Sequence, residues 1–382
     1  MFGKGNVNLL LIVAIVFALP LLLGFLQRDN DIDVKHLRSL YSQLPTYWPK
    51  ADIDAGIVFQ ELAALPISAV SDRDPTYRNL IDLGKKLFFD PRLSSSKQIS
   101  CSSCHDPDMH WTDGKIRAIG HNHRIGARNS PSISFAWQQD TIFWDGRAAT
   151  LEEQAKGSLS NPKEMNANLD SLPAIIGRVT GYHPLFNQIW GTTNPDLDQL
   201  VHAIATFVRS VKTSRSPFDR FVSGDTTALT DQQLLGLHLF RTKARCINCH
   251  SGPFFTDNGF HNIGFSLYGE AKEDQGRYVV TGIPSDMGKF KTPSLRNVTR
   301  TGPWLHNGMF QDLRGLINTY NNGMPRPKRK ENQLDDPLFP ETSVHLKPLN
   351  LTVPERDALI AFLESISTLP YPVNRPVLPD LK

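Results

Sequence analysis

Two copies of the pattern Cys-x-x-Cys-His contain all four cysteines of this 382-residue chain. The first copy runs from Cys101 to His105 and the second from Cys246 to His250. The pattern is typical of covalent attachment of a c-type haem, in which the cysteines bind the porphyrin and the histidine binds the iron. The sequence therefore predicts two covalently bound haem c groups, held by Cys101, Cys104, His105, Cys246, Cys249 and His250.

Other uses of paired cysteines explain the pattern less well. A zinc ribbon places its Cys-x-x-Cys pairs within about 20 residues of each other, whereas these pairs lie in different halves of the chain. A thioredoxin-like dithiol uses one motif and needs no histidine after it. Structural disulfides would leave both histidines unexplained. Covalent haem accounts for every residue of both motifs.

Matching segments surround the two motifs. Residues 83–88 and 234–240 precede them, with apolar side chains at helical spacing and a Leu-Gly-x-x-Leu-Phe pattern in each. Thr-Asp turns follow them, at 112–113 and 256–257. The order of helix, haem motif and turn therefore occurs twice along the chain.

Two capping boxes mark where helices should begin. Thr230 with Gln233 precedes the second haem motif, and Thr352 with Glu355 opens a final apolar helical stripe. Strand-like alternation is scarce. The predicted fold class is mostly α, with two cytochrome c-like domains that each carry one covalent c-type haem.

The N-terminal segment predicts export. After Lys4 the chain is uncharged from Gly5 to Gln27, which is long enough to span a bilayer at about 1.5 Å rise per residue. We expect a retained membrane anchor, because the apolar stretch is long for a signal peptide and no clear cleavage site follows it. A cleaved signal peptide is the alternative. Both place the haem domains in the periplasm.

Length and composition agree with two domains after this segment. A net charge of +3 gives no argument for nucleic-acid binding, and 27 prolines and 26 glycines predict long irregular connections. The predicted division is 1–29 as signal anchor or signal peptide, 30–75 as an irregular extension, 76–222 as the first haem domain and 223–382 as the second.

Four further blocks carry a family resemblance. They are Phe-Trp-Asp-Gly-Arg at 143–147, Asn-Pro-Lys-Glu-Met at 161–165, Lys-Thr-Pro-Ser-Leu-Arg-Asn-Val at 291–298 and the stretch 301–308. In this order around two haem motifs, they resemble the bacterial di-haem cytochrome c peroxidase and MauG family over about residues 80–368.

The resemblance implies roles for three side chains. Glu164 matches the acid–base residue over the peroxide-reacting haem of His105, and Gln154 matches the amide beside it. A carboxylate there can move a proton between the two peroxide oxygens. Trp144 matches the tryptophan between the two haems. The resemblance also implies a calcium ion at the domain interface, bound by Asn129, Thr301 and Pro303 mainly through backbone oxygens.

Two positions separate the relatives. Tyr320 stands where the peroxidases carry a methionine as sixth ligand of the C-terminal haem iron, as in MauG, with Met324 and Met309 as alternatives. His121 matches the histidine that closes the N-terminal iron of resting peroxidases, and His123 competes for that role. The chain also has Ser158 where MauG has a proline. Glycines around His121 suggest a mobile loop.

The leading functional hypothesis is a di-haem peroxidase that reduces hydrogen peroxide with electrons from a small cytochrome c or cupredoxin. A MauG-like oxidase acting on a partner protein, and a non-catalytic electron-transfer cytochrome, are the alternatives. The expected partners also include the membrane, through the N-terminal segment, and a second copy of the chain in a homodimer. Nucleic acid is not an expected partner.

Overall fold

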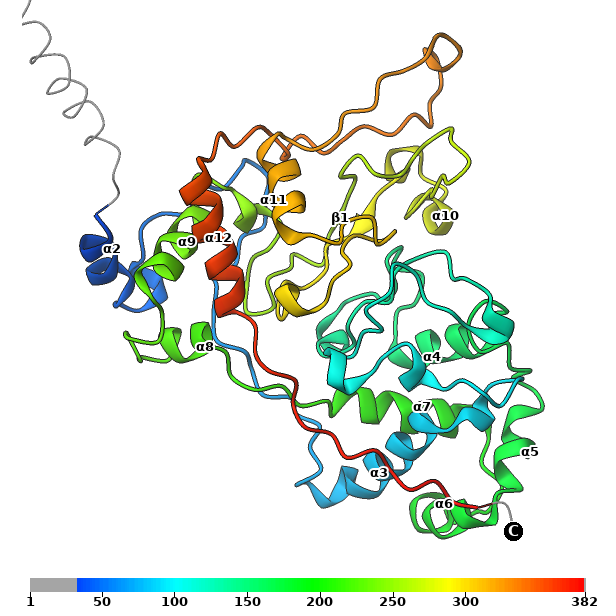
Figure 1. The fold of residues 1–382 in the computed structure, drawn as a ribbon. Coiled ribbons are helices and arrows are strands. Elements are labelled where there is room, and N and C mark those ends of the chain that lie inside the picture. The colour runs from blue at the N-terminus through cyan, green and yellow to red at the C-terminus, as the bar shows by residue number, and fades with distance from the viewer. Residues whose placement is uncertain (1–32, 381–382) are drawn as a thin grey trace, which may run out of the picture.

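The computed structural model describes residues 33–380 of the protein (Figure 1). The described chain is mostly helical, and its two short strands, β1 (Phe260–His261) and β2 (Phe290–Lys291), pair antiparallel. No helix among these residues is long and apolar enough to cross a membrane. The predicted anchor lies outside the described residues. The helices are α2 (Val34–Tyr41), α3 (Pro75–Phe89), α4 (Leu151–Ser160), α5 (Leu172–Gly177), α6 (His183–Trp190), α7 (Leu197–Arg209), α8 (Pro217–Val222), α9 (Asp231–Arg241), α10 (Tyr278–Thr281), α11 (Leu313–Asn321) and α12 (Val353–Ser365).

One helix pair supports the first haem motif. Helix α3 packs against α7 so closely that a Cβ atom added at Gly84 would lie 1.9 Å from the carbonyl oxygen of Ala203. The same added atom would lie 2.9 Å from Cβ of Phe207. Glycine is therefore required at position 84, because a side chain would push the two helices apart.

The same contact recurs before the second motif. Helix α9 packs against α12, and a Cβ atom at Gly236 would lie 1.9 Å from the carbonyl oxygen of Ala358 and 2.7 Å from Cβ of Phe362. The capping boxes at Thr230 and Thr352 open these two helices, as predicted. The repeat in the sequence is thus a repeated helix pair in the structure.

The apolar side chains form two core clusters. The first runs from Ile81 to Val211, and the second contains residues from 37–62 together with residues from 218–366. The N-terminal extension thus packs on the core that holds the second haem motif. Its buried members there are Leu37, Tyr41, Trp48, Ala51 and Leu62.

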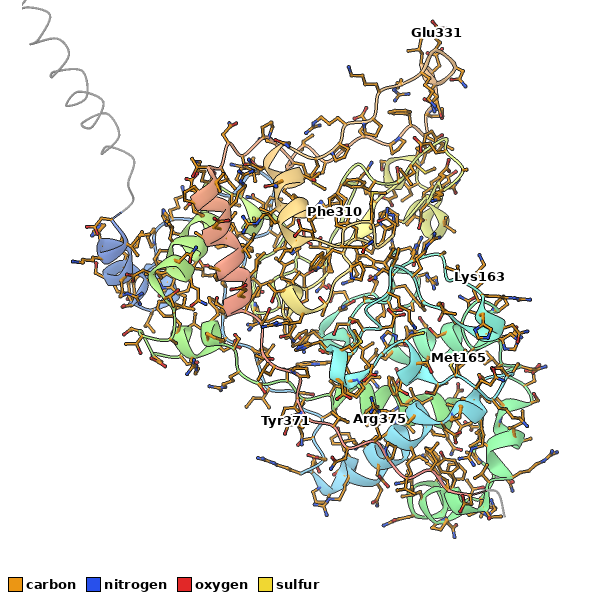
Figure 2. The ribbon with its side chains drawn as sticks, viewed as in Figure 1. Lys163, Met165, Phe310, Glu331, Tyr371 and Arg375 are labelled. Atoms are coloured by element: carbon orange, nitrogen blue, oxygen red, sulfur yellow. The ribbon has the colours of Figure 1, made fainter. Side chains whose placement is uncertain are left out.

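The C-terminal segment, residues 367–380, runs from α12 in the second half of the chain to the core of the first half (Figure 1). Val373 and Leu378 pack against the first core, and the carbonyl oxygen of Pro379 accepts a hydrogen bond of 2.7 Å from Arg92. Arg375 binds Asp106 and Asp108, directly after the first haem motif, at 3.0 Å each. Figure 2 labels Tyr371 and Arg375 on this segment.

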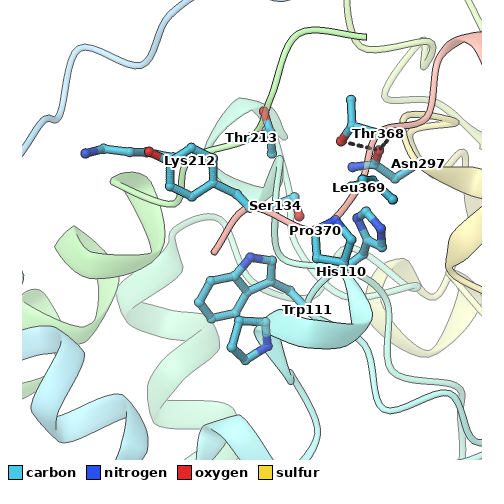
Figure 3. A pocket seen from close by; sticks show the side chains of 11 residues that line it. His110, Trp111, Ser134, Lys212, Thr213, Asn297, Thr368, Leu369 and Pro370 are labelled. Carbon is cyan, nitrogen blue, oxygen red and sulfur yellow. Dashed lines mark hydrogen bonds between the residues drawn. The ribbon is translucent and has the colours of Figure 1, made fainter. Parts of the chain in front are cut away.

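A small cavity lies under the start of this segment (Figure 3). His110 and Ser134 line it from the first half of the chain, and Asn297 and Thr368 line it from the second half. The Nε2 atom of His110 is buried there and has no hydrogen-bond partner in the structure. The cavity therefore lies at the seam between the two halves.

Candidate haem and peroxide site

Both haem motifs adopt the same local structure. Short 3-10 turns, Cys101–Ser103 and Cys246–Asn248, carry the cysteines, and none of the four is in a disulfide. The Nδ1 atom of His105 is bonded to the carbonyl oxygen of Trp111 at 3.0 Å, and that of His250 to Phe255 at 2.9 Å. A metal-binding histidine is usually oriented by such a bond, which leaves Nε2 for the metal. Both sites fit a covalently attached haem.

Burial favours the ligating form of both histidines. It lowers the pKa of His105 and of His250 below the ordinary value, against the opposing effect of the carbonyl hydrogen bonds. A histidine must be neutral to bind iron, so each ring is held in the required state.

Glu164 belongs to the surroundings of the first cysteine pair: burial raises the pKa of both thiols, and the charge of Glu164 raises it further. It lies in the loop after α4, between Lys163 and Met165, which Figure 2 labels. Burial raises the pKa of Glu164, while Ser158, Asn161 and Arg147 stabilise the charged form. The Asn161 amide donates to its Oε1 atom at 2.7 Å. The carboxyl of Glu164 is therefore buried, with one oxygen atom held by the Asn161 amide.

Gln154 lies on α4, one turn before Ser158. Its side-chain amide donates to the Ser158 hydroxyl at 2.8 Å. Because Ser158 also stabilises the charged form of Glu164, the three side chains belong to one polar group. The structure thus brings together Gln154, Ser158 and Glu164 beside the first haem motif.

His121 packs against the same loop. Its backbone N–H donates to the carbonyl oxygen of Glu164 at 2.7 Å, and its Nδ1 atom is buried without a partner in the structure. A Cβ atom at Gly120 would lie 2.1 Å from the carbonyl oxygen of Lys163. Glycine at this position therefore has a packing reason. His123, the competing histidine, is exposed.

Trp144 lies where the two halves of the chain meet. Its ring N–H donates to the carbonyl oxygen of Asn129 at 3.0 Å, and its ring centre lies 6.4 Å from that of His306. The backbone N–H of Asn129 donates to the carbonyl oxygen of His306 at 2.7 Å. Asn129 therefore lies beside the segment that contains Thr301 and Pro303. The calcium ion itself stays a prediction.

Tyr320 is carried to the second motif by α11. Burial raises the pKa of its phenol above the ordinary value, and the charges of Cys249 and Cys246 act in the same direction. Of the alternative ligands, Met309 is 46% exposed and Met324 is 6% exposed. Met309 is the poorer alternative because its side chain faces solvent.

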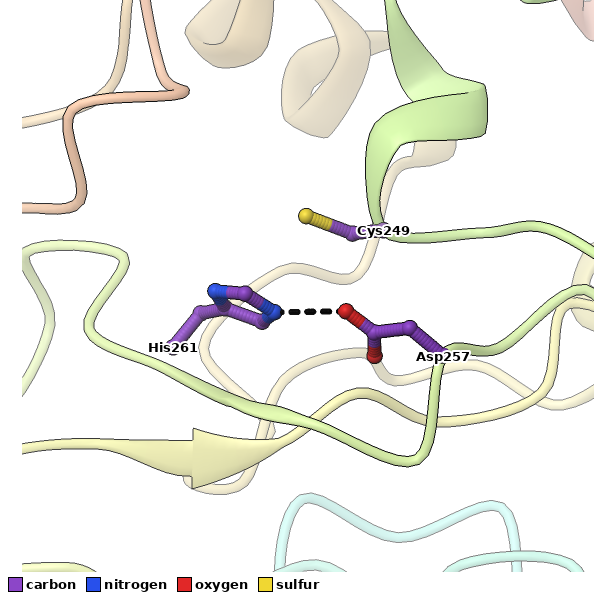
Figure 4. A group of neighbouring side chains, drawn as sticks. All are labelled: Cys249, Asp257 and His261. Atoms are coloured by element: carbon purple, nitrogen blue, oxygen red, sulfur yellow. Dashed lines mark hydrogen bonds and ion pairs between the residues drawn. The ribbon is translucent and has the colours of Figure 1, made fainter. Parts of the chain in front are cut away.

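Sequence reasoning missed two groups near the second motif. Ligand atoms of Cys249, Asp257 and His261 lie within 4.8 Å of one another (Figure 4). Cys249 belongs to the haem motif, so this cluster is part of that site and not a separate metal centre. The second group is the ammonium of Lys291, which is buried and hydrogen-bonded to Asn258 at 2.7 Å. In the sequence, Lys291 stands out only as the first residue of the stretch 291–298 that carries the family resemblance.

The chain is similar in sequence to known di-haem proteins. A family model described as di-haem cytochrome c peroxidase matches residues 78–227. The chain is 36% identical to the methylamine utilization protein MauG of Methylorubrum extorquens over 309 residues, which cover 80% of this chain and 83% of that protein. It is also 36% identical to the cytochrome c551 peroxidase of Nitrosomonas europaea over 266 residues, covering 69% and 78%.

Solved structures give the same result. A MauG-like protein associated with microbial copper homeostasis has a TM-score of 0.69 at 27% identity, covering 83% of this chain and 96% of that one. The di-haem peroxidase BthA from Burkholderia thailandensis has a TM-score of 0.64 at 27% identity, covering 87% and 96%. Both likenesses extend through the two halves of the described chain.

Proposed function

Because the chain belongs to the family of di-haem cytochrome c peroxidases and MauG, which are di-haem oxidoreductases, we propose that it reduces hydrogen peroxide to water. Two electrons and two protons convert one peroxide into two waters. The electrons come from a small cytochrome c or a cupredoxin. The observation that supports this proposal is the buried carboxyl of Glu164 beside the first haem motif.

Two sets of side chains hold the haems in this proposal. Cys101, Cys104 and His105 bind the first, in the domain 76–222, and Cys246, Cys249 and His250 bind the second, in the domain 223–382. When bound, the haem irons supply the redox chemistry, with peroxide reduction at the first and electron entry at the second.

Glu164 moves the proton. It accepts a proton from one peroxide oxygen and returns it to the departing oxygen, so that this oxygen leaves as water. Burial favours the protonated carboxyl, while Ser158 and Asn161 stabilise the charged form, so both states of the cycle are accessible. Gln154 orients Ser158, and His121 holds the backbone of Glu164.

Trp144 completes the path between the two halves. Its indole lies beside His306 of the second half and is held by Asn129 of the first half. An indole in this place can transmit electrons between the haems. The proposal also includes a calcium ion near Asn129, Thr301 and Pro303, and a periplasmic location.

The test is a peroxide assay on the purified di-haem protein with reduced cytochrome c or cupredoxin. Sustained oxidation of the donor, at two electrons per peroxide, is the expected result. Peroxide consumption that stops after one or a few turnovers in the presence of donor would contradict the proposal. No reaction with peroxide at all would favour a plain electron-transfer cytochrome.

A MauG-like oxidase is the second candidate function, and Tyr320 favours it. An anionic phenolate on the second iron would stabilise high oxidation states, which suit oxidation of a partner protein. In that case peroxide should oxidise a protein substrate, and small reduced donors should not sustain turnover.

A further inference from the structure

The described chain buries few basic side chains, and two of them have carboxylate partners. Arg241 binds Glu61, and Arg296 binds Asp219 at 2.7 Å. Their side chains are each 2% exposed. A buried cation requires such a partner, because its loss of hydration is large and only a nearby anion offsets it.

Lys291 is as buried as these arginines and lacks a carboxylate partner. It is 5% exposed, and no carboxylate oxygen of the described residues forms an ion pair with its ammonium. Its hydrogen bond goes to the neutral amide oxygen of Asn258 at 2.7 Å. Burial lowers its pKa to about 8, so the ammonium is still mostly charged at neutral pH. The described residues therefore leave one buried positive charge without an adjacent negative one.

Neither of the two nearby acids, Asp257 and Asp140, contacts the ammonium of Lys291. Asp257 accepts from His261 at 2.7 Å and from the backbone N–H of Gly259 at 2.8 Å. The charge of Asp140 acts more strongly on Lys291 than that of Asp257, but Asp140 is exposed and forms no hydrogen bond or ion pair with the ammonium. An anion from outside the polypeptide is the remaining partner.

The position of Lys291 indicates which anion this is. Its partner Asn258 follows Asp257, whose backbone N–H donates to the carbonyl oxygen of Cys249 at 2.8 Å. Asp257 and His261 also surround the sulfur of Cys249 (Figure 4). Strand β2 thus places the ammonium beside the second haem motif. A haem bound there has two carboxylates of its own, its propionates.

We propose that Lys291 binds a propionate of the C-terminal haem and raises the reduction potential of that haem. The inference rests on the proposed attachment of this haem at Cys246, Cys249 and His250. A fixed positive charge near a haem disfavours the ferric state, which carries one more positive charge than the ferrous state. Lys291 thereby offsets part of the effect of an anionic Tyr320 ligand.

The test compares three variants of the full di-haem protein. Lys291→Met removes the charge, and Lys291→Arg keeps it. Lys289→Met is the matched control, because Lys289 lies two residues away and its ammonium pairs with Asp286 at 3.1 Å. Mass spectrometry first counts the covalent haems, then a redox titration assigns a potential to each haem, and resonance Raman spectra report the propionate-bending band.

Lys291→Met should lower the potential of the C-terminal haem and shift its propionate band. Lys291→Arg and Lys289→Met should stay near the wild-type values. Two covalent haems with unchanged potential and Raman band in Lys291→Met would overturn the inference, as would a shift confined to the N-terminal haem. A wild-type protein without the second covalent haem would instead reject the proposed function.

If Lys291→Met loses the second haem altogether, Lys291→Arg decides. Retention of both haems and of the wild-type potential in Lys291→Arg supports the charge pair. Loss of haem in Lys291→Arg as well would show that the shape of the lysine matters rather than its charge, and would overturn the proposal.

Discussion

The proton-transfer role proposed for Glu164 rests on two features of its surroundings. Burial makes the neutral carboxyl accessible, and the Asn161 amide at 2.7 Å fixes the direction of its oxygen atoms. A carboxyl that was only exposed would stay charged, and one that was only buried would stay protonated. In the proposed mechanism, burial and hydrogen bonding together would let this carboxyl alternate between the two states.

Replacement of this carboxyl should remove proton transfer and spare the fold. We expect Glu164→Gln to keep both haems and to lower peroxide turnover by about 10²-fold or more. Glu153→Gln is the control, because Glu153 lies on α4, the helix that precedes the Glu164 loop, with its side chain exposed. Stopped-flow and steady-state assays measure the rates. Near-wild-type turnover in Glu164→Gln would remove Glu164 from the mechanism.

The side chain of Tyr320 is the proposed sixth ligand of the C-terminal haem iron. If its phenolate binds the C-terminal iron, Tyr320→Met should raise the reduction potential, since a neutral thioether favours ferrous iron more than an anionic oxygen does. Tyr320→Phe should open the iron or admit Met324. Redox titration with visible and EPR spectra measures both, with Tyr371→Phe as control. Unchanged spectra in Tyr320→Phe would exclude tyrosine as the ligand.

Residue type and spacing were sufficient to predict the haem motifs, because all five positions of each are consecutive. Lys291 was not predicted as a binding residue. The role that we propose for Lys291 depends on its burial and on the lack of a carboxylate in contact with its ammonium, and neither is visible in a linear sequence.

At the scale of elements, one contact supports each haem motif. Gly84 of α3 lies against α7, and Gly236 of α9 lies against α12. In each pair, the backbone of the second helix occupies the space that a side chain at the glycine would need. The tight contact lets the two helices of each pair share one core cluster. The glycines were present in the predicted helices, yet their packing role depends on helices that lie far away in the sequence.

Adding one methyl group tests this contact. Gly84→Ala and Gly236→Ala should each destabilise the protein by about 1–3 kcal/mol, because the helices must separate or bend. Gly177→Ala is the control, since a Cβ atom there meets its nearest neighbour at an ordinary 3.6 Å. Urea unfolding measures the free energies. Equal stability of all three variants would contradict the close approach.

The ion pair between Glu152 of α4 and Arg209 of α7 should make the stability of the folded chain depend on pH in acid. Burial acts to raise the pKa of Glu152, but its hydrogen bonds to Arg209, at 2.7 and 2.8 Å, bring the pKa down to about 2. The pKa is thus lower in the folded than in the unfolded chain. The stabilisation is complete above the ordinary value of 4.5 and is lost as the pH falls towards 2.

Glu152→Gln should therefore cost about 1 kcal/mol at neutral pH, after allowance for partial exposure, and much less near pH 2. Urea unfolding at several pH values measures the difference from wild type. Glu331→Gln, at the tip of an exposed loop (Figure 2), is the control. A difference that does not shrink with acid would mean that the carboxylate charge is unimportant there.

At the scale of the whole molecule, the two ends of the described chain cross over. Residues 37–62 pack on the second core, and residues 373–378 pack on the first. Each terminal segment therefore links the two halves of the chain, in addition to the stretch of chain that joins them directly. This crossing was not predicted. The extension was expected to be irregular, whereas its first residues form α2 (Val34–Tyr41), and a local pattern does not show which distant core a segment packs on.

The C-terminal segment should act mainly through apolar packing and not through its charges. Arg375 is 58% exposed at its side chain, and exposed ion pairs contribute only about 0–1 kcal/mol. Val373 and Leu378 instead cover part of the first core, and Pro370 and Tyr371 cover the cavity of His110.

Removing the segment from Pro370 onward should lower the melting temperature while both haems remain attached, and should make the two halves more sensitive to protease. Arg375→Gln keeps the segment and should change stability little. Calorimetry and limited proteolysis compare the two variants with wild type. A truncated chain as stable and as protease-resistant as the full one would show that the crossing segment does not hold the halves together.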